Sequence, residues 1–98
     1  SSAASDVYKR QVFRFGGEEF LILLSNTGRD AAGMVGERLR RAAEAQDYWA
    51  DGKRIELTVS LGCSTLLAAE SAESLLRRAD NALYVAKREG RNRLAMAG

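Results

Sequence analysis

Gly16-Gly17 divides two short apolar segments and makes the chain reverse direction between them. Paired glycines are a strong turn signal, because glycine reaches backbone conformations that other residues avoid. Residues 12–15 read as a short strand, and residues 20–24 form a continuous apolar run typical of a strand buried on both faces. Two strands across a tight glycine turn predict a β-hairpin.

A helix is expected over residues 30–46, where apolar side chains recur at the 3.6-residue period. Asp30 suits its N-cap, where a carboxylate accepts hydrogen bonds from free backbone N–H groups. Gly33 and Gly36 weaken the first turns of this helix, since an interior glycine costs about 1 kcal/mol relative to alanine.

The second half of the chain has a clearer pattern. Residues 55–63 alternate apolar and polar side chains and predict a strand. Residues 71–89 form the clearest helix, with Gly90 where a glycine commonly ends a helix, and residues 93–96 read as a final short strand. Helices that alternate with strands after a hairpin indicate an α/β sandwich, with helices covering a mixed sheet.

The length of 98 residues allows one domain or less. Residues 1–11 show no periodic pattern and read as an unstructured tail. Their SDVYKRQ stretch resembles peptides that arise when sequencing adapters are translated, so the tail is also read as artefactual. Residues 12–98 are then the folded part.

Composition excludes several classes of function. One cysteine, Cys63, and no histidine exclude a disulfide within the chain and Ser–His or Cys–His catalysis, and argue against a zinc site. A net charge of +2 with scattered arginines argues against nucleic acid as a partner. No apolar run is long enough for a membrane span, so we expect a cytoplasmic segment without membrane contact, whether or not its parent protein is membrane-anchored.

Glu18 and Glu19 follow the glycines directly. Neighbouring side chains on a regular strand point to opposite faces, but at a glycine turn both carboxylates can converge on one point. Paired carboxylates suit Mg²⁺, which takes oxygen ligands and keeps waters and substrate phosphates. The same residues also fit a solvated hairpin turn with surface glutamates, and spacing alone does not separate the two interpretations.

Lys87 and Arg91 lie four residues apart at the end of the second expected helix, with Gly90 between them. Such a pair can hold a triphosphate, with bidentate contacts from arginine and a point charge from lysine. Basic residues also stabilise the negative end of a helix dipole, which is the alternative interpretation.

Together these features resemble the GGDEF domain family of diguanylate cyclases. RFGGEEF resembles the signature turn of the family, and TVSLG at residues 58–62 resembles its next core strand. ADNALYVAKREGRNRL at residues 79–94 resembles its last helix and strand. The resemblance runs from Val12 to about Ala95 and implies the C-terminal half of such a domain, a nucleotidyl-cyclase-type α/β sandwich truncated at its N-terminus.

The resemblance implies condensation of two GTP molecules to cyclic di-GMP and two pyrophosphates, by two domains that face each other in a homodimer. Glu18 is implied as the catalytic residue, which holds Mg²⁺ or Mn²⁺ and helps to deprotonate the ribose 3′-hydroxyl. Glu19 is implied as a second metal ligand. Four further residues are implied to contact GTP: Gly16, Gly17, Lys87 and Arg91.

The chain departs from the family pattern in two places. No residues match the metal-binding Asp of the family's opening strand or the residues that read guanine. The family's inhibitory Arg-x-x-Asp product site falls on Val7 and Arg10, so that site is absent. Arg38 matches a secondary arginine in product binding, and it also fits a solvated helix arginine.

Three hypotheses follow. The first is a diguanylate cyclase, inactive as this fragment alone, whose parent protein carries a sensor or receiver domain upstream. The second is a non-catalytic GGDEF-type module that binds GTP or cyclic di-GMP for regulation. The third is a gene fragment without function of its own. The intact GGEEF turn favours the enzyme, and the SDVYKRQ stretch favours the fragment.

Overall fold

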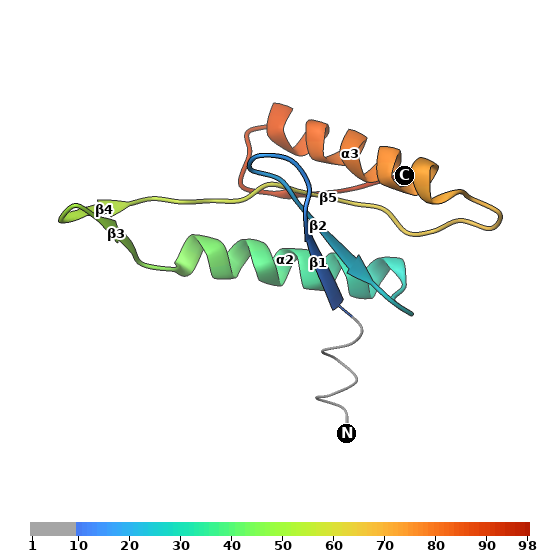
Figure 1. Ribbon diagram of the computed structural model, residues 1–98, viewed down its shortest axis with the longest axis horizontal. Helices are drawn as coiled ribbons and strands as arrows, with labels where there is room; N and C mark the ends of the chain where they lie inside the picture. Colours follow the sequence, from blue (N-terminus) through green and yellow to red (C-terminus); the bar gives the residue numbers. More distant parts are fainter. Residues whose placement is uncertain (1–9) are drawn as a thin grey trace, which may run out of the picture.

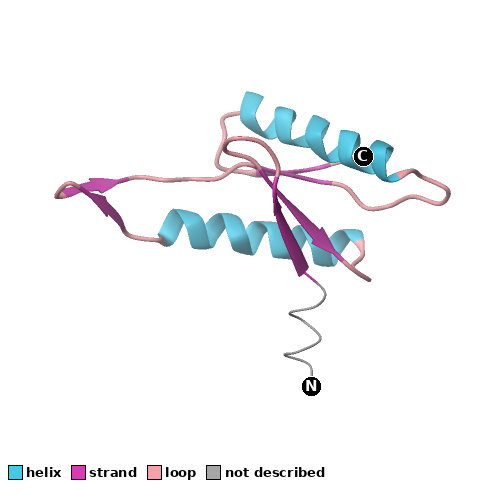
Figure 2. Cartoon of the chain, in the orientation of Figure 1, coloured by secondary structure: helices cyan, strands magenta, loops and turns pink. Residues whose placement is uncertain are grey.

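The computed structural model describes residues 10–98, which form six strands and two helices (Figure 1). The elements, in chain order, are β1 Arg10–Arg14, β2 Phe20–Leu24, α2 Arg29–Ala45, β3 Tyr48–Ala50, β4 Lys53–Ile55, β5 Leu61–Cys63, α3 Ala72–Arg88 and β6 Leu94–Met96. Coloured by secondary structure, the chain shows the two helices on either side of short strands (Figure 2). Neither helix in this part of the chain is long and apolar enough to cross a lipid bilayer.

The hairpin predicted around the glycines is confirmed. β1 and β2 are antiparallel, and their register places Arg14 opposite Phe20. β1 begins at Arg10, so residues 10 and 11 are strand and not tail, because they pair with Leu24 and Leu23. The rest of the expected tail, residues 1–9, lies outside the described residues.

The expectation that both faces of residues 20–24 are buried is wrong. Phe20 is 66% exposed and Leu23 is 44% exposed. Among residues 10–98, β2 is hydrogen-bonded to β1 alone, so within this part of the chain its apolar side chains lack the second neighbouring strand that a central strand has.

The first helix forms nearly where the periodicity predicts it, but its cap is different. Gly28 is the N-cap residue and Asp30 lies in the first turn, where its charge still favours the positive end of the helix. Gly36 is buried, and a Cβ built on it would lie 3.1 Å from Leu94 Cδ1. The glycines that weaken the helix therefore let α2 approach β6 closely, with Met96 against Gly33.

Residues 55–63 do not form one continuous strand. Asp51-Gly52 is a turn that joins β3 to β4, which pair with each other, and β4 ends at Ile55. β5 begins only at Leu61 and pairs with β6 in parallel. The alternating pattern therefore spans two strands and the extended segment that links them.

The second helix matches its prediction closely. The Ser71 side chain caps it by accepting a hydrogen bond from the Ser74 N–H. At its C-terminus the Gly90 N–H donates to the Lys87 carbonyl and the Arg91 N–H to the Ala86 carbonyl, which is a Schellman motif. Gly90 has a positive φ of 126°, as its predicted role requires.

The strands β5 and β6 lie between the two helices and form the centre of the fold (Figure 1). The buried side chains here are small: Ala32 of α2, and Ala82 and Ala86 of α3. Gly62 of β5 allows the closest approach, since a Cβ there would overlap the Ala79 carbonyl oxygen and the Leu83 backbone nitrogen. β5 therefore packs on α3 with almost no side chain between the two backbones.

The mixed α/β class is confirmed, with antiparallel and parallel strand pairs. Within residues 10–98 these pairs form three separate two-stranded sheets rather than one continuous sheet. A groove of ≈ 680 Å³ separates β2 from β5 and α3. Its apolar lining includes Leu21, Ile22, Leu24, Leu61, Cys63 and Leu76.

We expect Gly62→Ala to lower the free energy of unfolding more than an alanine substitution at a glycine that has no neighbouring atoms near its Cβ position. The added methyl group would collide with backbone atoms of α3, and overpacking of this kind costs about 1–3 kcal/mol or more. Gly17→Ala is the matched control, because nothing lies within 4 Å of a Cβ built there. Equal urea midpoints for the two variants would contradict the close packing of β5 on α3.

Candidate functional site

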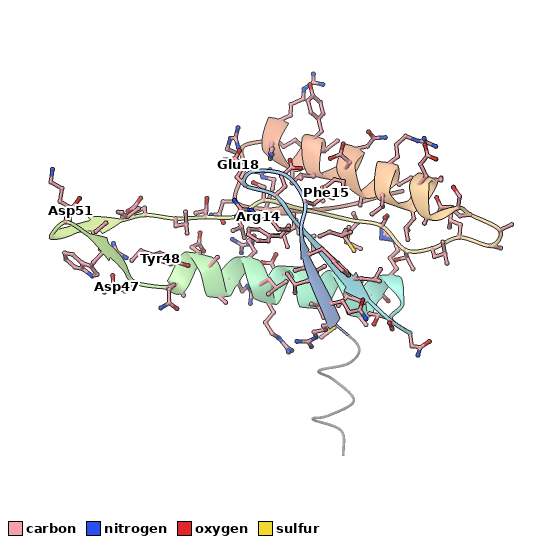
Figure 3. The ribbon with its side chains drawn as sticks, viewed as in Figure 1. Arg14, Phe15, Glu18, Asp47, Tyr48 and Asp51 are labelled. Carbon is pink, nitrogen blue, oxygen red and sulfur yellow. The ribbon has the colours of Figure 1, made fainter. Side chains whose placement is uncertain are left out.

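The turn between β1 and β2 carries Glu18 and ends at Glu19, and Figure 3 shows Glu18 at this turn. The Phe15 N–H donates to the Glu19 carbonyl at 2.8 Å and closes the turn. Arg14 Nη2 donates to the Gly17 carbonyl at 2.9 Å, and Gly16 has a positive φ of 95° that favours glycine. The turn is thus held by its own backbone and by Arg14, a supporting role that the sequence does not signal.

The turn places Glu18 and Glu19 in different surroundings. Glu18 is exposed. The Glu19 carboxylate lies 3.5 Å from Lys87 Nζ, an ion pair that joins the hairpin to the end of α3 across 68 positions in sequence. The structure therefore brings together two of the residues predicted to form one site, from opposite ends of the chain.

Arg91 follows Lys87 by four residues, just after Gly90. Its backbone is left-handed, with φ 64°, and its side chain is exposed. Among residues 10–98 its guanidinium has no hydrogen bond or ion pair, so its charge is available to an anion. Arg38 lies exposed on α2 and has no polar partner in the same part of the chain, so the structure does not join it to the other candidates.

The donor set at the turn fits a divalent cation in part. Two adjacent carboxylates are ligands that Mg²⁺ accepts, and it commonly keeps waters and substrate phosphates as its remaining ligands. Over residues 10–98 no group of three acidic, histidine or cysteine side chains gathers in one place. Glu19 is also held by Lys87, so a cation would compete with an ammonium group for that carboxylate.

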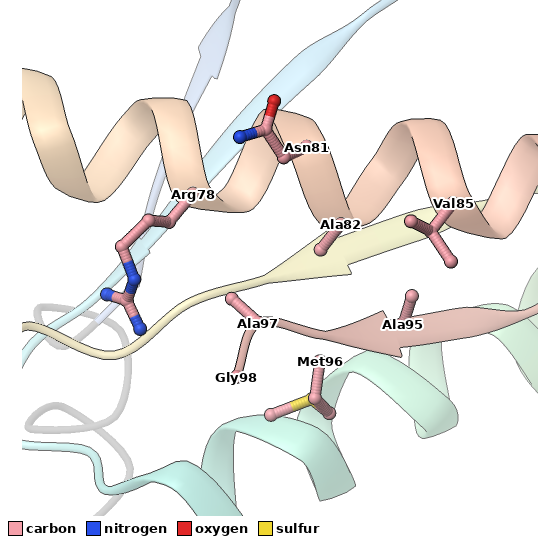
Figure 4. Close-up of a pocket in the computed structure, with 8 residues that line it drawn as sticks. All are labelled: Arg78, Asn81, Ala82, Val85, Ala95, Met96, Ala97 and Gly98. Atoms are coloured by element: carbon pink, nitrogen blue, oxygen red, sulfur yellow. The ribbon is translucent and has the colours of Figure 1, made fainter.

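Two hollows lie near the strands. The groove beside β2 includes Glu19 in its lining and so opens next to the candidate site. A second cavity of ≈ 320 Å³ lies between α3 and the C-terminal residues that include β6, where Ala82 and Val85 point from α3 towards the strands (Figure 4). No predicted site residue lines this second cavity.

Burial raises the pKa of the Cys63 thiol, which lowers its reactivity at neutral pH.

A polar cluster around Asn92, the residue that follows Arg91, was not predicted from the sequence. Asn92 contacts Arg40 and Glu44 of α2 through its side chain, and Ser60 through its backbone N–H. The available signal is the asparagine itself, since asparagine is the residue after glycine that best tolerates a left-handed backbone, and Asn92 has φ 45°.

Comparison with known proteins gives a consistent result. A family model described as "Diguanylate cyclase, GGDEF domain" matches residues 2–93. The chain is 46% identical over 85 residues to Diguanylate cyclase A of Treponema denticola, and 43% identical over 86 residues to Diguanylate cyclase DgcP of Pseudomonas aeruginosa. These matches cover 86% and 88% of this chain, but it spans only 23% and 13% of the length of those relatives.

Solved structures agree with the sequence comparison. The GGDEF domain of DgcB from Caulobacter crescentus, in complex with c-di-GMP, has a TM-score of 0.89 and 29% identity, covering 98% of this chain and 58% of that one. The active GGEEF domain of a diguanylate cyclase from Vibrio cholerae has a TM-score of 0.78 and 33% identity, covering 91% of this chain and 56% of that one.

We expect Lys87→Gln to strengthen binding of Mn²⁺ at the turn by about 1.4- to fivefold. An exposed ion pair is worth about 0.2–1 kcal/mol, and the substitution frees the Glu19 carboxylate from it. Broadening of the Glu18 and Glu19 amide signals by Mn²⁺ in NMR spectra measures the affinity. Arg88→Gln, which removes a neighbouring charge that has no ion pair within residues 10–98, is the control. Equal affinities for the two variants would show that Lys87 does not compete for Glu19.

Proposed function

The chain belongs to the GGDEF domain family, and we propose that it supplies part of a diguanylate cyclase site, which condenses two GTP molecules to cyclic di-GMP and two pyrophosphates. One observation carries the proposal. The Lys87–Glu19 contact of 3.5 Å brings the carboxylate turn beside the basic end of α3. A site for a metal-bound triphosphate needs carboxylates and cations at such close range.

The proposed roles follow from the chemistry of each side chain. Glu18 and Glu19 would hold Mg²⁺ or Mn²⁺, and Glu18 would help to remove the proton from the attacking ribose 3′-hydroxyl. When bound, the metal supplies positive charge that stabilises the phosphoryl oxygens during transfer. Gly16 and Gly17 leave open space around the turn, since no atom lies within 4 Å of a Cβ built at either, and so allow the nucleotide to approach.

Lys87 and Arg91 would bind the triphosphate. Negative charge builds up on the leaving pyrophosphate as the new bond forms, and fixed cations there lower the barrier. The Arg91 guanidinium can make bidentate contacts to phosphate, whereas the Lys87 ammonium acts as a point charge. Lys87 would then exchange its Glu19 partner for phosphate oxygens when the nucleotide and metal bind.

Formation of a cyclic product from two GTP molecules calls for two such sites facing each other, so we propose a homodimer as the active form. We also propose that this reaction takes place in the cytoplasm, where GTP is available. Another similar structure, diguanylate cyclase SiaD of Pseudomonas aeruginosa, was solved with its activator SiaC, at a TM-score of 0.84 and 35% identity. Control by a further protein or domain is accordingly part of the proposal.

A regulatory module that binds cyclic di-GMP is the second candidate function. Two similar structures of DgcB from Caulobacter crescentus contain c-di-GMP. In this chain Arg38 is the candidate for product binding, because it matches a secondary product-binding arginine of the family, and it lies exposed on α2 without a polar partner in residues 10–98. The inhibitory Arg-x-x-Asp pair is absent from the two positions where it would fall: Arg10 is exposed at the start of β1, and Val7 lies outside the described residues.

A chimaera tests the proposed function. Residues 10–98 replace the matching segment of Diguanylate cyclase A from Treponema denticola, and cyclic di-GMP is measured by chromatography after incubation with GTP and Mg²⁺. We expect the chimaera to make product, Glu18→Ala to abolish it and Glu18→Asp to retain part, because aspartate keeps a carboxylate for the metal. Product formation by Glu18→Ala at the parent rate would rule out the metal-ligand role.

The 98-residue chain alone should form no product under the same conditions. Its described residues gather only two carboxylates at the turn, and a missing ligand in a phosphoryl-transfer site costs several kcal/mol of barrier. Each 1.36 kcal/mol is a tenfold loss of rate. A chimaera that binds cyclic di-GMP but never consumes GTP would favour the regulatory module instead.

A further inference from the structure

The turn that carries Arg91 has a strained backbone, and three sets of hydrogen bonds stabilise it. Gly90, Arg91 and Asn92 follow one another with positive φ values of 126°, 64° and 45°. Residues other than glycine adopt such a backbone rarely, and they keep it only where the surrounding structure enforces it. The first support is the Schellman motif, in which the Arg91 N–H donates to the Ala86 carbonyl at 3.0 Å.

The second and third supports come from Asn92. Its backbone N–H donates to Ser60 Oγ at 3.1 Å, just before β5. Its side-chain oxygen accepts a hydrogen bond of 2.9 Å from Arg40 Nη1, and its side-chain nitrogen donates to the Glu44 carboxylate. One asparagine therefore connects the end of α3 with α2 and with the approach to β5.

Arg40 is itself fixed in place. Its side chain is only 16% exposed, and its guanidinium donates to the Glu37 carboxylate through Nε at 3.0 Å and Nη2 at 2.6 Å. Glu44 lies 3.6 Å from Arg40 Nη1. Hydrogen bonds from Arg40 lower the pKa of Glu37, so that carboxylate keeps its charge to a lower pH than an unpaired glutamate. The charge of Arg40 is thus satisfied within the protein.

Arg91 differs in this respect, since its guanidinium has no polar partner among residues 10–98. The cluster thus presents one arginine whose charge is satisfied, Arg40, which supports the turn, and one whose charge is free, Arg91, which the turn presents. We propose that Asn92, held by Arg40 and Glu44, is a positioning residue that orients Arg91 towards the triphosphate. This inference rests on the proposed use of Arg91 in binding GTP.

The chemistry of the Asn92 amide makes the proposal specific. Its oxygen faces a donor and its nitrogen faces an acceptor, so it matches both partners at once. Asn92→Asp keeps the size of the side chain and its tolerance of positive φ, but sets a carboxylate against that of Glu44. Glu44→Gln in the same chain restores a donor to that contact, which exchanges the acid and the amide between the two positions.

The test compares the 98-residue parent chain with Asn92→Asp, with the double variant Asn92→Asp/Glu44→Gln and with Arg41→Gln. Arg41 is the control, because it pairs with Glu37 but does not touch Asn92. Hydrogen exchange of the Arg91 and Asn92 amides reports the turn. Titration with a GTP analogue that cannot release pyrophosphate, in the presence of Mg²⁺, reports binding, and the same titration of Arg91→Gln reports the contribution of Arg91.

We expect Asn92→Asp to speed exchange at these two amides and to weaken analogue binding, each by about tenfold, because a charge-assisted hydrogen bond is lost. The double variant should recover most of both, and Arg41→Gln should match the parent. Unchanged exchange in Asn92→Asp would overturn the role of the network. Faster exchange with unchanged binding would overturn the positioning of Arg91. A parent chain that binds no analogue would instead contradict the proposed use of Lys87 and Arg91 in binding the triphosphate, and the inference would fall with it.

Discussion

Close contact between the backbones of β5 and α3 is the constraint on which the rest of this structure depends. Gly62 has no Cβ, so the strand lies directly on the helix at Ala79 and Leu83. Small residues continue this pattern, with Ala82 and Ala86 buried on α3 and Gly36 facing Leu94 on the opposite side. The β5–β6 pair is therefore a thin layer between two helices. Glycine and alanine residues at the contacts set how closely each helix approaches this layer.

This layer fixes the position of α3 beside the strands, and the candidate site forms at the C-terminal end of α3. β6 begins shortly after the Gly90 turn, and its pairing with β5 brings the chain back beneath α3. Lys87 then reaches the hairpin turn, where Glu19 accepts its charge. The site thus combines the capped end of a helix with a hairpin whose second strand, β2, lines an open groove.

Charge is distributed unevenly around the site. Arg40, Arg78 and Lys87 all pair with carboxylates, whereas Arg91 is exposed without such a partner in residues 10–98. Ionic groups that are paired hold elements together, as when Arg78 joins α3 to Glu70 and to the Thr65 carbonyl. An arginine held in a left-handed turn without a carboxylate is suited instead to an anionic ligand, which is why Arg91 is central to the proposed function.

The sequence alone determined the elements whose signals are local. The glycine turn, the capped helix that ends at Gly90, the α/β class and the family all follow from spacing, propensity and motif, because those depend on neighbours in the chain. Only the tertiary structure decided the rest. The exposure of β2, the division of residues 55–63 between two strands, the Lys87–Glu19 pair and the Asn92 cluster all depend on partners distant in sequence, and local patterns carry no record of such partners.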